Sequence, residues 1–110
     1  MSDPHPLAQM AAREQPAPVA RGAEVVPWLL GWLAATEAPV EVVEAVRARD
    51  ALGRVRYGQG LRTLDGRDPV ADLAQELADA LVYLARLRML GLTGDECRPL
   101  LQALITLWTR

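Results

Sequence analysis

The segment 67–90 constrains the fold more than any other part of the chain, because it is the longest uninterrupted run with helical periodicity. Its apolar residues recur at steps of three or four, at Val70, Leu73, Leu77, Leu81 and Leu84. That spacing aligns them on one face of an α-helix. Asp68 followed by Pro69 is typical of a helix start, and Gly91 is typical of a helix end. The sequence therefore predicts one long amphipathic helix with a core-facing stripe.

A second stripe of this predicted helix is acidic. Asp72, Glu76 and Asp79 repeat at steps of four and three, so their carboxylates lie along one line. Like charges at this spacing repel by roughly 0.2–0.5 kcal/mol per pair, and no Arg stands four residues away to relieve them. We expect the compensating charge to come from outside the helix, either from a divalent cation or from an Arg of another segment.

Three further segments have helical patterns, at 24–36, 39–56 and 93–108, and Pro99 falls near the first turn of the last one. The hydrophobic content of 51% with no Phe favours a core built from Leu, Val and Ala. The expected fold class is therefore all-α, a four-helix bundle whose loop-linked neighbours run antiparallel. Residues 1–22 contain four prolines and no periodic apolar pattern, which predicts a disordered N-terminal tail before a single helical domain at 23–110.

Composition excludes several classes of chemistry. The single Cys97 cannot form an internal disulfide and suits the cytoplasm, and the single His5 makes histidine-based catalysis and ordinary zinc sites improbable. The net charge of −2 argues against nucleic-acid binding, including binding through the Arg-rich segment 47–67. No apolar stretch is long enough to cross a membrane. Any chemistry must depend on carboxylates, Arg and Tyr.

A second acidic line accompanies the predicted helix 39–56, at Glu37, Glu41 and Glu44. Within a bundle, the pair Glu41 and Glu44 can face the pair Glu76 and Asp79, each pair being spaced i, i+3 with Cβ atoms roughly 5–6 Å apart. Four such carboxylates suit Mg²⁺, with Mn²⁺ as an alternative. The alternatives are that the glutamates are simply solvated, or that the second pair binds Arg47 or Arg54.

These residues resemble a known family. Glu41-Val-Val-Glu44 followed by Glu76-Leu-Ala-Asp79 resembles the ExxE and ExxD motifs of the all-α, MazG-like nucleoside triphosphate pyrophosphohydrolases. The segment 56–84, RYGQGLRTLDGRDPVADLAQELADALVYL, looks more specifically like the small MazG-like proteins of phages and actinobacteria. The chain departs from the family pattern in having Val40 and Gln75 where acids are common, and in having no Lys.

The resemblance implies a Mg²⁺-dependent hydrolase that cleaves a nucleoside triphosphate to the monophosphate and pyrophosphate, as a homodimer or homotetramer. The catalytic metal ligands implied are Glu41, Glu44, Glu76 and Asp79. Candidate substrate-binding residues, near the phosphates or the base, are Arg56, Tyr57, Arg62, Arg67 and Tyr83. Arg forks well onto phosphate oxygens. Tyr83 is otherwise expected to be a half-buried core residue.

The alternative from another class is a non-catalytic helical oligomerisation or interaction module with a degenerate MazG-like site. Its assembly would depend on Trp28, Trp32 and Trp108. Trp28 and Trp32 stand four residues apart and are expected to share one helix face. We expect that face to be buried core, with a dimer surface or a base-stacking platform as the alternatives.

Overall fold

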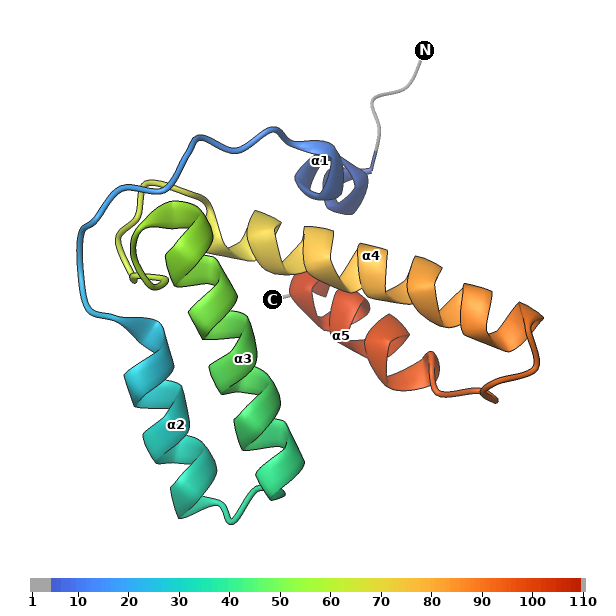
Figure 1. Cartoon of the computed structure of the whole chain (residues 1–110). Helices are drawn as coiled ribbons and strands as arrows, with labels where there is room; N and C mark the ends of the chain where they lie inside the picture. Colours follow the sequence, from blue (N-terminus) through green and yellow to red (C-terminus); the bar gives the residue numbers. More distant parts are fainter. Residues whose placement is uncertain (1–4, 110) are drawn as a thin grey trace. The chain divides into compact units, whose positions relative to one another are not determined.

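The computed structural model describes residues 5–109, which form helices without any β-strand beyond an isolated bridge (Figure 1). The helices are α1 (Pro6–Ala12), α2 (Val25–Ala35), α3 (Val40–Tyr57), α4 (Pro69–Met89) and α5 (Arg98–Thr109). The all-α prediction is confirmed, and each of the four predicted helical segments contains a helix. None of the described helices is long and apolar enough to span a membrane.

The described chain divides into two compact units, one formed by residues 16–67 and the other by residues 5–15 together with 68–109. This division differs from the predicted boundary between a tail and a domain at residue 22. Each unit is described by itself below. The packing of all four long helices into one bundle stays a prediction.

The unit 16–67 is built around the hairpin of α2 and α3, which pack side by side (Figure 1). The extended segment before α2 pairs with the loop that follows α3. Backbone hydrogen bonds join Val19 to Asp65, Thr63 to Ala23 and Val25 to Leu61, each at 2.9 Å. The loop is therefore held by the chain that precedes α2.

In the other unit, α4 packs against both α1 and α5 (Figure 1). The side-chain amide of Gln15 holds the start of α4 in two directions, donating to the carbonyl of Asp68 at 2.8 Å and accepting from its N–H at 3.1 Å. Gln75 donates to the carbonyls of Met10 and Arg13, at 3.1 and 2.7 Å. These bonds fix residues 10–15 along the first turns of α4.

Part of the segment that was predicted to be a disordered tail is helical in the structure. Residues 1–4 lie outside the described part, but Pro6–Ala12 form α1, with Pro6 in its first turn and the His5 ring nitrogen accepting from Leu7 N–H at 3.1 Å. A helix this short has no periodicity to detect and is marginal alone. Its contacts with α4, which lies more than fifty residues away, supply the stability that the local sequence lacks.

The last helix begins later than predicted, at Arg98 instead of near residue 93. The hydroxyl of Thr93 donates to the carboxylate of Glu96 in the turn that precedes α5, and this bond lowers the pKa of Glu96. Pro99 then falls in the first turn, where its missing N–H costs nothing. The start of α4 agrees with the sequence, because Asp68 caps it.

The core is small and made largely of small side chains. Among the described hydrophobic residues, Leu33 of α2 is 7% exposed, and Ala71 and Ala74 of α4 are completely buried. The predicted α4 stripe is half-buried at Leu77, Leu81 and Leu84, whereas Leu73 is 48% exposed. The closest packing of α4 is therefore made by alanines, and the leucines lie at the half-buried margin of the same face.

Candidate functional site

The two carboxylate pairs lie where the sequence places them, on α3 and on α4. Glu41 is in the first turn of α3 and Glu44 follows one turn later, while Glu76 and Asp79 lie in the middle of α4. All four residues are exposed to solvent. Within residues 5–109, none of their carboxylates has a hydrogen bond or an ion pair. The predicted lack of a partner along each helix is therefore observed.

The pairs belong to different units, with Glu41 and Glu44 in residues 16–67 and Glu76 and Asp79 in the other unit. Within the described part of the chain, no group of three or more His, Cys, Asp or Glu side chains is arranged to hold a metal ion. The structure thus shows two separate pairs of exposed carboxylates. A site that uses all four stays a prediction.

The two acidic lines are shorter than the sequence suggests. Glu37 lies before α3, in the turn after α2, so it does not continue the line of Glu41 and Glu44. Asp72 is half-buried and its carboxylate accepts a hydrogen bond from the Gln15 amide at 3.3 Å. The exposed acids on α4 are therefore reduced to Glu76 and Asp79, because residues from the predicted tail engage Asp72.

Arg54, one of the two Arg residues considered as ionic partners for Glu76 and Asp79, is engaged elsewhere; the other is Arg47. Arg54 donates to Asp50 at 2.9 Å and to Glu24 at 3.1 Å, both within the unit 16–67. These hydrogen bonds, the one to Asp50 foremost, raise the pKa of Arg54 further above its usual value. Arg54 thus links the start of α2 to the interior of α3.

Four of the five candidate substrate-binding residues gather around the loop after α3. Tyr57 is the last residue of α3 and is 54% exposed, and the guanidinium of Arg56 lies 5.3 Å from the centre of its ring. A cation over an aromatic face at this distance is attracted by the ring. Arg56 and Tyr57 therefore form an exposed pair at the entrance of the loop.

Arg62 and Arg67 hold the segment that precedes α2. Arg62 donates through Nη1 to the carbonyl of Gly22 at 2.9 Å, and Arg67 donates through Nη1 to the carbonyl of Pro16 at 2.7 Å. Local sequence patterns do not predict these contacts, because residues 16–22 have no periodicity of their own. Both guanidinium groups thus have a structural task within this unit.

The same loop contains two buried polar atoms without hydrogen-bond partners in the described structure, Oε1 of Gln59 and Nε of Arg62. Such atoms are uncommon in folded proteins. Gln59 was not among the predicted site residues. The only sequence signal that pointed to it was its place in a glycine-rich loop of unusual length.

The aromatic candidates differ from expectation in their burial. Tyr83, one turn beyond Asp79, is 67% exposed, so the core assignment is wrong and its ring is accessible. Trp28 and Trp32 share a face as predicted, with parallel rings whose centres are 6.5 Å apart. They are 70% and 52% exposed, so the prediction that they are buried core is wrong in this structure.

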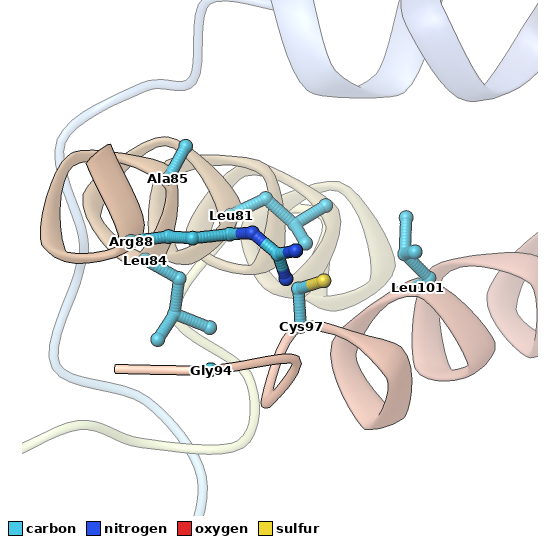
Figure 2. A pocket seen from close by; sticks show the side chains of 7 residues that line it. All are labelled: Leu81, Leu84, Ala85, Arg88, Gly94, Cys97 and Leu101. Carbon is cyan, nitrogen blue, oxygen red and sulfur yellow. The ribbon is translucent and has the colours of Figure 1, made fainter. Parts of the chain in front are cut away.

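A hollow of about 260 Å³ lies between α4 and the start of α5, and none of the predicted site residues lines it. Its walls are formed chiefly by Leu81, Leu84 and Leu101, together with Cys97 and Arg88. Figure 2 shows the Arg88 side chain extending from α4 toward Cys97. Arg88 also pairs with Asp95. The hollow is apolar and holds no carboxylate, so it does not suit a metal-dependent reaction on a polyphosphate.

Comparisons of the chain with models of known families, with curated proteins and with solved structures found no match. The case for a function therefore depends on the residues of this chain and on their placement.

Proposed function

We propose that this chain is a Mg²⁺-dependent nucleoside triphosphate pyrophosphohydrolase of the MazG-like type, acting in the cytoplasm as a homodimer or homotetramer. The observation that supports it best is the presence of two exposed i, i+3 carboxylate pairs, one on α3 and one on α4, whose carboxylates have no partner among the described residues. Uncompensated carboxylates at this spacing repel each other, and a bound cation removes that cost.

The chemistry of the donors fits magnesium. Glu41, Glu44, Glu76 and Asp79 offer only hard carboxylate oxygens, which Mg²⁺ prefers together with waters and substrate phosphates. In the proposed enzyme these carboxylates hold the metal, and each pair presents both of its side chains from a single helix. When bound, Mg²⁺ neutralises the charge of a polyphosphate and lowers the pKa of a coordinated water.

The loop after α3 supplies the remaining functions. Arg56 is an exposed guanidinium beside Tyr57, and such a group forks onto phosphate oxygens. Arg62 is a second guanidinium of the same loop, and it donates to the carbonyl of Gly22 at 2.9 Å. Arg67 holds this loop in place. On α4, the exposed ring of Tyr83 is the candidate contact for the base.

The second candidate is a non-catalytic helical oligomerisation or interaction module. It is favoured by the exposure of three large aromatic residues, Trp28 at 70%, Trp32 at 52% and Trp108 at 42%. In that case the carboxylate pairs are solvated surface. The two candidates make opposite predictions about nucleotides and magnesium.

Pyrophosphate release measured across a panel of canonical and modified nucleoside triphosphates, with and without Mg²⁺, tests the first candidate. We expect the double variant Glu76→Gln, Asp79→Asn to lose hydrolysis while keeping the helical circular dichroism signal. Glu14→Gln is the matched control, because it also removes one exposed carboxylate, outside α3 and α4. Hydrolysis by the double variant at the wild-type rate would exclude these two acids from the site.

Thermal melting with increasing Mg²⁺ separates the two candidates without knowledge of the substrate. An ion that binds only the folded state raises the melting temperature, by an amount that grows with its concentration. We expect the rise in the wild type and in Glu14→Gln, and its absence in the double variant. A melting temperature that does not respond to Mg²⁺ in the wild type supports the interaction module.

A further inference from the structure

We draw no further inference here: the strongest candidate, the apolar hollow between α4 and the start of α5, carries none, because the guanidinium of Arg88 at its wall already pairs with Asp95 and nothing in the described structure shows what would fill it.

Discussion

Helices α2 and α4 begin in opposite ways. At α4 the carboxylate of Asp68 accepts hydrogen bonds from the N–H groups of Val70 and Ala71, at 3.0 and 3.2 Å. At α2 the side chain of Glu24 makes no capping bond and instead accepts from Arg54, which lies thirty residues away, at 3.1 Å. The start of α4 is thus stabilised by neighbours in sequence, whereas the start of α2 depends on a distant residue.

The same two helices end in the same backbone motif with different residues in its left-handed position. Gly91 follows α4 with a φ of 71°, and Glu37 follows α2 with a φ of 55°. In both cases an N–H beyond the helix reaches back to a carbonyl five residues earlier, from Leu92 to Leu87 and from Ala38 to Leu33. This Schellman motif suits glycine, while a residue with a Cβ atom is strained there.

Burial repeats the contrast. Ala71 and Ala74 of α4 are completely buried, while in α2 only Leu33 is buried and both tryptophans are exposed. Helix α4 therefore has local caps, a glycine end and packed alanines within its own unit. Helix α2 has none of the local signals and is covered on one side only. The difference indicates that the bounds of α4 are determined by its own sequence, whereas those of α2 depend on the residues that pack against it.

The largest effect is expected when the same substitution is placed in the two helices. Ala74→Leu forces three additional carbon atoms into a site that is 0% exposed, and overpacking of this kind costs about 1–3 kcal/mol of unfolding free energy. Ala34→Leu, at an exposed position of α2, changes it by less than about 0.5 kcal/mol. Chemical denaturation of the two variants measures both values. Equal losses would show that α2 is packed as closely as α4.

A smaller effect is expected at the cap of α4. The N–H groups of Ala71 and then Val70, with the guanidinium of Arg13, lower the pKa of Asp68. A lowered pKa means that the ionised carboxylate adds stability above its ordinary value of about 3.9, and that this stability is lost as the pH falls through the lower folded-state pKa. Asp68→Ala removes the cap, and we expect its melting temperature to fall by roughly 4–8 °C near neutral pH.

Asp68→Asn serves as the control for this prediction, because asparagine still accepts the capping bonds but does not ionise. Its stability relative to wild type should be lowest near neutral pH and should recover as the solution is acidified below about pH 4. Denaturation curves at neutral and acidic pH check the sign. A difference between the two proteins that is the same at both pH values would show that the charge of Asp68 contributes nothing.

The contrast between α2 and α4 also explains how much of the fold is predictable from sequence. The bounds of α4 follow from Asp68, Pro69 and Gly91, three residues whose local chemistry starts or ends a helix. The presence of α1 depends on contacts that local patterns do not encode. Helix α1 is held by Gln75, more than sixty residues along the chain, and nothing in its own seven residues indicates that contact.

The candidate site divides in the same way. Helical spacing alone correctly places Glu41 with Glu44 and Glu76 with Asp79, because i, i+3 neighbours share a face in any helix. Spacing gives no information on which loop residues are already engaged. Arg62 and Arg67 donate to the backbone carbonyls of residues 22 and 16, and these bonds form only because the segment before α2 folds back onto the loop. The burial of the Gln59 side chain is likewise not predictable from spacing.

The smallest effects are expected at the left-handed ends, where the two helices can be made alike. Glu37→Gly relieves a strain of about 1–2 kcal/mol but increases the entropy of the unfolded chain by about 0.4–1 kcal/mol, so a net gain of roughly 0.5–1 kcal/mol should remain. Gly91→Ala makes the opposite exchange and should lose a similar amount. Denaturant midpoints with unchanged m-values would confirm both signs. Destabilisation by Glu37→Gly would mean that the glutamate side chain contributes more than its backbone strain costs, and that the end of α2 is held by a contact of its own.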